Sequence, residues 1–272
     1  MRIAILGTGH RPTGGLQPPA EILSASAPQS EPFLIETRVS RFPGTPGDRQ
    51  VVDLLYLEAG YRAADAGADA IFVNTVGDYG LRELQNSLSV PAVGAGAAAM
   101  SLAAALGGQF SIVTIWPPAL DFIYTRVLEQ CGLESRCIGI RHLSQDSLLQ
   151  TLGADDDFVE TMRAGRASTI ERVVAEADAA LASDGAGAVM LGCTCMAPIA
   201  AAVQRAAIGP VIDPMTQGFR ETEIAVARQR ASAAVPAPVR PADRGAVRDW
   251  VAALESGVET ECLPCDVLGS AD

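Results

Sequence analysis

The chain has 272 residues, of which 49% are hydrophobic and only 5% aromatic, so its core consists mainly of Ala, Val, Leu and Ile. The formal net charge of −12 leaves no basic surface for nucleic acid or an anionic membrane, and we expect neither as a partner. No stretch approaches the roughly 18 uncharged apolar residues of a membrane helix, and the N-terminus lacks a signal-peptide pattern. We therefore expect a cytoplasmic protein whose six cysteines are free thiols.

Short apolar strands alternate with helices along the chain. The first part predicts a helix at 49–66, a loop at 11–29, and strands at 2–7, 33–39, 70–73 and 90–93. The second part predicts strands at 110–116 and 136–141, a strand ending before Cys193, a strand at 210–212, and helices at 120–128, 157–182 and from Cys193 to about 207. This alternation predicts an α/β fold with parallel sheets covered on both faces.

The two parts of the chain resemble each other. Residues 67–75 align without gaps on 185–193, residues 90–93 match 209–212, and residues 3–8 pair more loosely with 111–116. Because the matches keep the same order, an internal duplication explains them better than chance. We expect two pseudo-symmetric doubly wound domains with an active site between them. The predicted domains are 1–95 with about 213–230, then 96–212, followed by a Pro/Ala-rich linker, short helix and tail at 231–272.

Cys193 is the main candidate for chemistry. The apolar run 189–191 ends at Gly192-Cys193-Thr194, and Pro198 follows, which predicts a strand end directly before a helix. A thiol at the positive end of a helix is favoured as the thiolate. A buried structural thiol is the alternative. Cys195 is expected to point into the core of the second domain.

The alignment places Thr75 opposite Cys193. A threonine hydroxyl can donate a hydrogen bond but hardly acts as a base near neutral pH. Hydroxyl and amide groups at a strand end can hold a carboxylate or a developing enolate. The predicted substrate-binding residues are Thr8, Asn74, Val76, Thr114 and Thr194, and the predicted catalytic residues are Cys193 and Thr75.

A second acid or base could come from either of two residues. His10 follows the first strand, and Asp78 lies in the segment after Thr75. For His10 a loop position without a role is the alternative, and for Asp78 a turn or helix cap. His142 is expected to be structural.

At these residues the chain resembles the aspartate/glutamate racemase superfamily, most closely its hydantoin racemase branch. The similarity rests on residues 68–81, 90–94, 110–114 and 189–196 and extends from residue 1 to about 225. It implies cofactor-free proton transfer at a carbon next to a carbonyl, in a small carboxylate or cyclic amide. Members usually carry one cysteine per domain. Thr75 stands where the first would be, and only the second is kept, as in the arylmalonate decarboxylases.

Several functions fit one thiol: an isomerisation, a decarboxylation of a 2-substituted malonate with protonation, or a racemisation with an unusual second base. A non-catalytic binding protein for a small acid is the alternative from another class. We expect no cofactor and no metal, because Gly7-Thr8-Gly9 lacks the dinucleotide spacing and no metal-type cluster occurs. A homo-oligomer is possible.

The tail carries a further motif and a further helix. Cys262 and Cys265 have redox-motif spacing but lie in the tail, where we expect mobility, with a disulfide possible on oxidation. Residues 243–254 predict an amphipathic helix that packs on the body or a second subunit, with one apolar face formed by Val247, Trp250, Val251 and Leu254.

Overall fold

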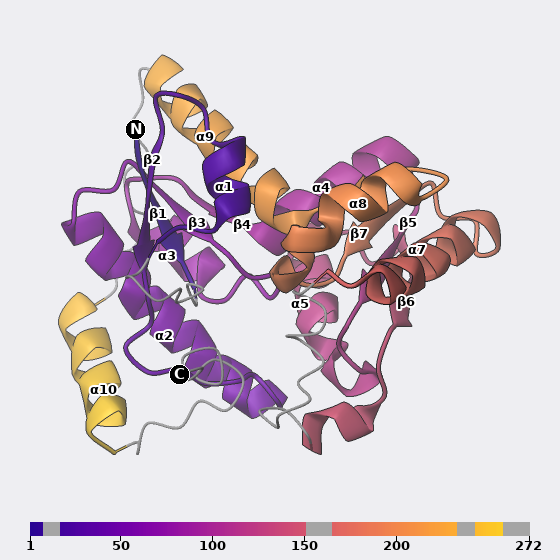
Figure 1. Cartoon of the computed structure of the whole chain (residues 1–272). Helices are drawn as coiled ribbons and strands as arrows, with labels where there is room; N and C mark the ends of the chain where they lie inside the picture. The colour runs from indigo at the N-terminus through magenta and orange to yellow at the C-terminus, as the bar shows by residue number, and fades with distance from the viewer. Residues whose placement is uncertain (8–16, 151–164, 233–242, 258–272) are drawn as a thin grey trace. The chain divides into compact units, whose positions relative to one another are not determined.

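The computed structural model describes residues 1–7, 17–150, 165–232 and 243–257 (Figure 1). The predictions for Thr8, His10, the first part of the 157–182 helix and the Cys262/Cys265 pair lie outside these ranges. The chain divides into two compact units. Unit 1 comprises Met1–Asn74, Asp78–Gly94 and Phe219–Asp272, and unit 2 comprises Thr75–Gly77 and Ala95–Gly218. None of the helices in the described ranges is long and apolar enough to span a membrane.

Unit 1 contains a four-stranded parallel sheet in the order β2-β1-β3-β4. Its strands are β1 (Arg2–Leu6), β2 (Glu31–Ile35), β3 (Ala70–Val73) and β4 (Ala92–Gly94). Its helices are α1 (Ala20–Ala25), α2 (Pro46–Asp65), α3 (Leu81–Ser87), α10 (Arg244–Gly257) and the part of α9 (Pro214–Ala231) from Phe219 onward. All four residues of β3 are buried, and Phe72 meets Phe219 of α9 edge-on at 6.0 Å between ring centroids.

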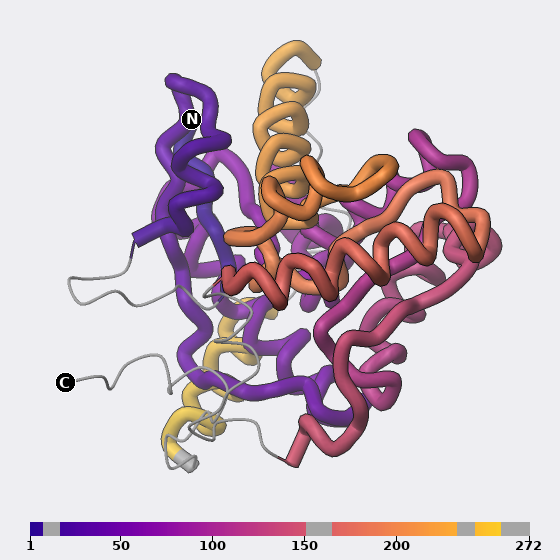
Figure 2. The backbone as a smooth tube through the Cα atoms, turned by 45° about the vertical axis from the view of Figure 1, so that its right-hand side comes forward, coloured from indigo at the N-terminus to yellow at the C-terminus, as the bar shows by residue number. Residues whose placement is uncertain are grey.

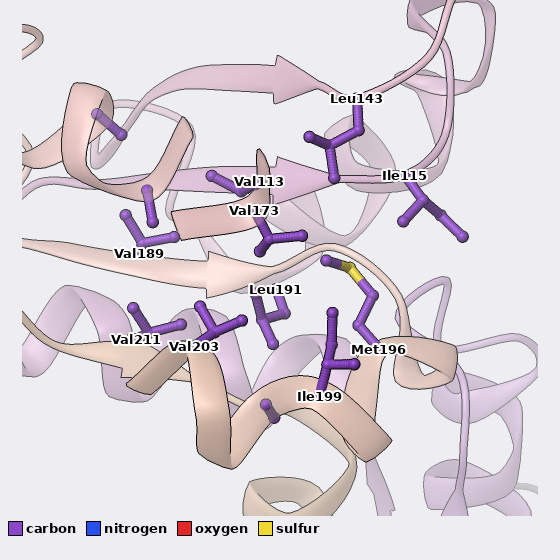
Figure 3. Packing of buried hydrophobic residues seen from close by; sticks show 13 residues of the cluster. Val113, Ile115, Leu143, Val173, Val189, Leu191, Met196, Ile199, Val203 and Val211 are labelled. Atoms are coloured by element: carbon purple, nitrogen blue, oxygen red, sulfur yellow. The ribbon is translucent and has the colours of Figure 1, made fainter. Parts of the chain in front are cut away.

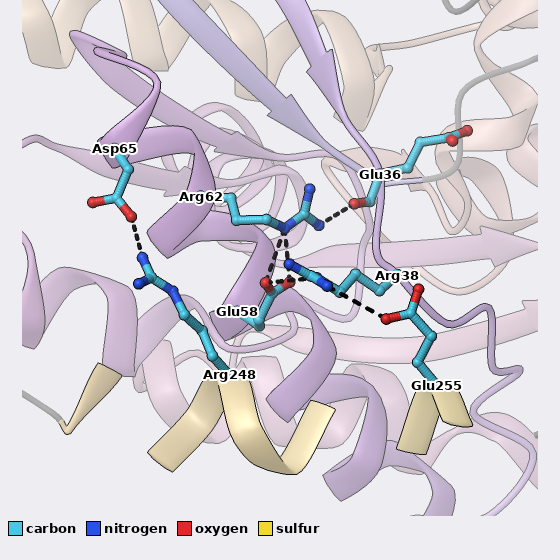
Figure 4. A network of polar contacts seen from close by, with 7 residues as sticks. All are labelled: Glu36, Arg38, Glu58, Arg62, Asp65, Arg248 and Glu255. Carbon is cyan, nitrogen blue, oxygen red and sulfur yellow. Dashed lines mark hydrogen bonds and ion pairs between the residues drawn. The ribbon is translucent and has the colours of Figure 1, made fainter. Parts of the chain in front are cut away.

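Helix α2 is fixed at its start by a cap and along its length by charge pairs. The Asp48 N–H donates to Thr45 Oγ1 at 3.1 Å, and the Thr45 hydroxyl donates to the Asp48 carboxylate at 2.7 Å. Further along, Glu58 is fully buried, and its carboxylate forms ion pairs with Arg62 Nε at 2.9 Å and with Arg38 Nε at 3.1 Å (Figure 4). A buried carboxylate needs such partners, since desolvation penalises an unpaired charge.

Helix α10 packs against α2, in agreement with the expected docking of the tail helix on the body. Figure 4 shows two of its ion pairs, Arg248 with Asp65 and Glu255 with Arg38. Its inward face carries Val247 and Val251, which are buried. The placement of Trp250 on this face was wrong, because its side chain is 60% exposed. Val247 and Val251 lie four residues apart and set the buried stripe, from which Trp250 is turned away.

Unit 2 repeats the architecture with a parallel sheet in the order β6-β5-β7-β8. Figure 2 traces the backbone of this unit, from magenta to orange along the chain. Its strands are β5 (Phe110–Thr114), β6 (Cys137–His142), β7 (Ala188–Leu191) and β8 (Val211–Ile212). Its helices are α4 (Ala95–Gly107), α5 (Phe122–Cys131), α7 (Ala167–Ala182), α8 (Ala197–Ala206) and the start of α9. Three short 3₁₀ turns are described as well: η1 (Pro118–Leu120), η2 (Asp146–Gln150) and η3 (Thr194–Met196).

The sheet of unit 2 has a separate apolar cluster on each face, because alternate residues of a strand point to opposite sides. One cluster contains Val113 of β5 and Val189 and Leu191 of β7, with residues of α7 and α8 (Figure 3). The other contains Ile112 and Met190 with residues of α4 and α5. Both faces are therefore covered, as predicted for a parallel sheet.

The internal duplication is visible in the hydrogen bonds. Three hydrogen bonds of unit 1 have equivalents in unit 2. Two are between backbone groups: the Ile71 N–H donates to Pro91 O as Val189 does to Pro210 O, both at 2.9 Å, and the Asn74 N–H donates to Leu6 O at 2.9 Å as Gly192 does to Val113 O at 2.7 Å. The third comes from a glutamine side chain: Gln85 donates to Ala92 O at 2.9 Å, and Gln204 donates to Val211 O at 3.0 Å. The predicted alignment of the first strands was wrong by one residue, since Leu6 is equivalent to Val113 and not to Thr114. The polar residues Ser111 and Thr114 of β5 have no polar counterpart in residues 3–6 of β1, so they do not fix the register of the alignment.

Several elements differ from the predictions. Strand β2 begins at Glu31 and ends at Ile35, earlier than expected, and α1 lies inside the predicted loop. Helices α3 and α4 were not predicted. Helix α4 is rich in Ala and Gly, and its buried positions Ala95, Ala99 and Ala103 are chemically like its exposed ones. Such a helix shows no contrast between an apolar and a polar face, which is the signal that sequence patterns use.

Candidate functional site

Cys193 lies where the carboxyl end of β7 turns into a helix. The four residues of β7 are buried, Gly192 follows, and Cys193 is still extended with φ −148° and ψ 137°. The turn η3 and then α8 begin directly after it, and the Cys195 N–H donates to Cys193 Sγ at 3.2 Å. The sulfur of Cys193 thus caps the start of the helical segment, and the residue lies at the strand end that the sequence predicted.

The expectation of free thiols is wrong for two of the cysteines. The structure joins Cys193 and Cys195 by a disulfide, with Cα atoms 5.2 Å apart. This separation falls within the range that a disulfide spans. The physical reason is local, because an extended residue followed by a 3₁₀ turn directs the side chains of residues 193 and 195 to the same side. Cys131 and Cys137 are not in a disulfide.

Cys195 is half-buried and lies at the margin of the apolar cluster that contains Leu191 and Met196. Cys193 lies at the same margin. Cys195 therefore contacts the core of unit 2, as expected, but its sulfur also bonds to Cys193.

Thr75 occupies the equivalent place after β3. Its Oγ1 accepts the N–H of Gly77 at 3.2 Å, in the same i to i+2 contact that Cys193 makes with Cys195. Segment Thr75–Gly77 belongs to unit 2, where Val76 is 4% exposed and shares an apolar cluster with Met190. Because the Val76 side chain is committed to this core, only its backbone is available for the predicted substrate contact.

Next to Gly192 lies a buried hydroxyl pair, Thr114 and Tyr124; the sequence predicted Thr114 as a site residue but not Tyr124. Tyr124 of α5 donates its hydroxyl to the Gly192 carbonyl at 2.8 Å and lies 2.5 Å from Thr114 Oγ1. Thr114 is fully buried and also accepts the N–H of Trp116 at 3.1 Å. The hydroxyl of Thr114 is therefore engaged inside unit 2, which favours a role in holding the strand end over direct substrate contact.

Gly192 is required by this close approach. A Cβ atom at residue 192 would lie 2.5 Å from Thr114 Cβ, 2.8 Å from Thr114 Oγ1 and 3.0 Å from the Tyr124 hydroxyl. No side chain fits without movement of these groups, since real Cβ contacts are longer. Tyr124 carried no sequence signal, because an aromatic residue on an amphipathic helix ordinarily indicates core packing.

Asn74 and Asp78 belong to unit 1. Asn74 is 9% exposed, and its N–H donates to Leu6 O at 2.9 Å. Asp78 is 3% exposed and has φ 48°, a left-handed conformation unusual for a residue with a side chain. Its carboxylate lies against Gly94, where a Cβ atom would overlap it. The Asp78 carbonyl also accepts the Leu81 N–H at the start of α3 at 3.2 Å, which fits the predicted turn or cap.

His142 ends β6, where it is held on both ring nitrogens. Nδ1 lies 2.8 Å from Trp116 O, and Nε2 lies 3.3 Å from Asp121 Oδ1. Burial raises the pKa of Asp121, and the opposite charge of a protonated His142 lowers it in part. This pair ties the end of β6 to the start of α5 in unit 2 and fits the structural role expected for His142.

Comparison with known proteins identifies the family. The family model for Asp/Glu/hydantoin racemases matches residues 19–222. The chain belongs to the Asp/Glu/hydantoin racemase family. It is therefore an enzyme of the racemase and isomerase type, and the predicted superfamily and fold class are confirmed.

Individual relatives agree with this placement. A hydantoin racemase of Pseudomonas sp. (strain NS671) is 26% identical over 220 residues, which cover 81% of this chain and 80% of that protein. The allantoin racemase of Klebsiella pneumoniae has a TM-score of 0.67 and 25% identity, covering 84% of this chain and 88% of the other. A mutant arylmalonate decarboxylase, 14% identical with a TM-score of 0.57 and coverages of 84% and 94%, shares the fold.

The assignment of roles to individual residues stays a prediction, as does the location of the active site between the halves.

In the described part of the chain, no three His, Cys, Asp or Glu side chains gather closely enough to hold a metal ion.

Proposed function

We propose that this enzyme moves a proton, without a cofactor, at the activated α-carbon of a hydantoin-type substrate and that the reduced thiol of Cys193 is its acid and base. The observation that carries the proposal is the placement of Cys193 Sγ at the end of β7, at the start of a helical segment. The family membership and the hydantoin racemase relatives support the substrate class.

The chemistry starts from the thiolate, because a disulfide sulfur has no proton to give or take. The helix start favours the charged sulfur. The thiolate removes the proton from the carbon next to the carbonyl, and the resulting enolate oxygen needs hydrogen-bond donors. Thr194, Thr75 and Asn74 are the proposed donors. The protonated thiol then returns a proton to the carbon. Delivery from the same side exchanges the hydrogen with retention of configuration, and racemisation requires a second group that delivers the proton from the opposite side.

Thr75 favours a reaction on one face. In a two-base racemisation one group removes the proton and another delivers it from the opposite side. The residue equivalent to Cys193 is Thr75, and its hydroxyl is too weakly acidic near neutral pH for this role. This observation supports a second candidate reaction, the decarboxylation of a 2-substituted malonate followed by protonation by Cys193. Asp78 is the proposed substitute base if racemisation occurs, and His10 is the alternative.

A solvent-exchange experiment tests the proposal. The reduced enzyme is incubated in deuterated water with single enantiomers of 5-substituted hydantoins and, separately, with 2-substituted malonates, and products are examined by mass spectrometry and chiral separation. We expect deuterium at the α-carbon, and a rate about 10²–10⁴-fold lower for Cys193→Ser, the range of one acid–base group. Cys131→Ser is the matched control, because Cys131 lies in the same unit and is not in a disulfide.

Two results would contradict the proposal. One is the absence of deuterium from every substrate and product with the reduced wild type. The other is a Cys193→Ser enzyme that exchanges the label as fast as the Cys131→Ser control.

A further inference from the structure

Cys193 and Cys195 form a pair that the first half of the molecule does not repeat. In the duplicated alignment Thr75 is equivalent to Cys193 and Gly77 to Cys195, so the same turn there contains no sulfur. In unit 2 the turn carries two thiols whose sulfur atoms bond to each other. We propose that this pair is a reversible oxidation site that switches off the acid/base thiol; the inference rests on the proposed function of Cys193.

The backbone brings the two sulfurs together without any other part of the chain. Cys193 is extended, and η3 turns the chain within the next three residues. The N–H of Cys195 points at Cys193 Sγ, at 3.2 Å, and the Cα atoms are 5.2 Å apart. Both residues are half-buried. The approach of the sulfurs therefore needs only side-chain rotation about a fixed turn.

The oxidation balances with a peroxide as the oxidant. The Cys193 thiolate attacks one oxygen of hydrogen peroxide, the O–O bond breaks, and a sulfenic acid and one water result after protonation. The Cys195 sulfur then attacks the sulfenic sulfur and displaces the hydroxyl, which leaves as a second water. The two thiols lose two electrons and two protons, and the peroxide is reduced. A dithiol such as dithiothreitol reverses the step by disulfide exchange.

The consequence for the proposed reaction is complete loss of the acid/base group. In the disulfide neither sulfur binds a proton that could be transferred to carbon. A second consequence is protection, because a sulfenic acid captured by Cys195 does not proceed to the irreversible sulfinic acid. Cys195 is thus a resolving residue for Cys193 and takes no part in the proton transfer.

The other described cysteines provide internal controls. Cys131 and Cys137 are not in a disulfide and are partly buried in the same unit. Burial raises the pKa of Cys137, so little of it is thiolate at neutral pH and its reaction with peroxide is slow. Oxidation is therefore expected first at Cys193, whose sulfur lies at the start of a helix.

The test uses the full chain in a Cys262→Ser/Cys265→Ser background, so that the tail cysteines do not contribute. Reduced protein is treated with hydrogen peroxide, free thiols are alkylated, and the proteolytic fragment containing residues 193 and 195 is weighed. Incorporation of solvent deuterium at the α-carbon of the substrate is measured in parallel, before and after dithiothreitol. We expect an unalkylated fragment that lacks two hydrogens, an exchange rate below about a tenth of the reduced rate, and full recovery on reduction.

Cys195→Ser separates the switch from simple damage. Its exchange rate before oxidation should match the reduced parent, but after peroxide its loss should persist in dithiothreitol, because the Cys193 sulfenic acid oxidises further. Cys131→Ser and Cys137→Ser should behave as the parent does. The inference is overturned if Cys193 and Cys195 are both still alkylated when the reagent is added after peroxide, or if the exchange rate of Cys195→Ser recovers in dithiothreitol as that of the parent does.

Failure of the proposed function gives a different pattern. If the reduced parent exchanges no deuterium with any substrate, the proton-transfer proposal fails, and fragment masses then decide the redox pair by themselves. Reversible disulfide formation in the fragment would support the pair as an oxidation site, and alkylation of both residues would refute it.

Discussion

Tyr124→Phe removes one hydroxyl, which contacts Gly192, the residue before Cys193. The hydroxyl donates to Gly192 O at 2.8 Å and contacts Thr114 Oγ1 at 2.5 Å, and Tyr124 is 1% exposed. The phenylalanine ring fills the same space, but the buried carbonyl loses its donor, which costs about 1–3 kcal/mol of unfolding free energy. Thr114 keeps the Trp116 N–H as a donor, but its own hydroxyl loses the Tyr124 oxygen as an acceptor, so the loss falls on both Gly192 and Thr114.

The assay combines urea unfolding with the alkylation rate of Cys193 in the reduced protein, followed by mass spectrometry. Tyr61→Phe is the matched control, since Tyr61 is fully buried in unit 1 and its hydroxyl lies 3.2 Å from Ser87 Oγ. Both variants should lose stability, but only Tyr124→Phe should change the alkylation and proton-exchange rates at Cys193. The reasoning fails if Tyr124→Phe unfolds at the wild-type urea concentration, or if both variants leave Cys193 equally unchanged.

Four further substitutions have defined outcomes. Gly192→Ala should lower the free energy of unfolding by about 1–3 kcal/mol by overlapping Thr114, and an unchanged urea midpoint would contradict this. The pKa of Asp48 is lowered by its hydrogen bond from Thr45 and by Arg41, so its contribution is present above the unfolded value of 3.8 and is lost as pH falls through the folded one. Asp48→Asn should therefore cost about 0.5–1 kcal/mol at pH 7 and progressively less below pH 4 in acid-unfolding curves. Val251→Ala should cost about 1–2 kcal/mol in thermal unfolding, whereas Trp250→Ala should change little because Trp250 is exposed.

The fold could be predicted where apolar strands end at recognisable turns. Residues 70–73 appear as β3 with the predicted bounds, and Gly132 ends α5 in the left-handed conformation that glycine favours. Prediction failed where the chemical contrast vanishes. Helix α4 has alanines on both its buried and its exposed sides. The first strands can be aligned one residue out of register, because Ser111 and Thr114 of β5 have no polar counterpart in residues 3–6 of β1.

The candidate site shows the same division. Cys193 and Thr75 could be paired from the duplicated segments alone, and the structure gives them the same hydrogen-bond contact. The disulfide partner of Cys193 was not predicted, because the direction of a side chain two residues away depends on whether the turn is extended or 3₁₀. Tyr124 could not be found, since its contact with Gly192 joins residues 68 positions apart.

The central claim is that one thiol, Cys193, acts on one face of the substrate because Thr75 replaces the second. Thr75→Cys tests this most directly, with reduced protein, single hydantoin enantiomers and chiral separation of the products in deuterated water. If Cys193 acts on one face only, Thr75→Cys should racemise the substrate at least about tenfold faster than the wild type, and Thr75→Ser should not. Equal racemisation rates for the wild type and Thr75→Cys, with Cys193 intact in both, would contradict it.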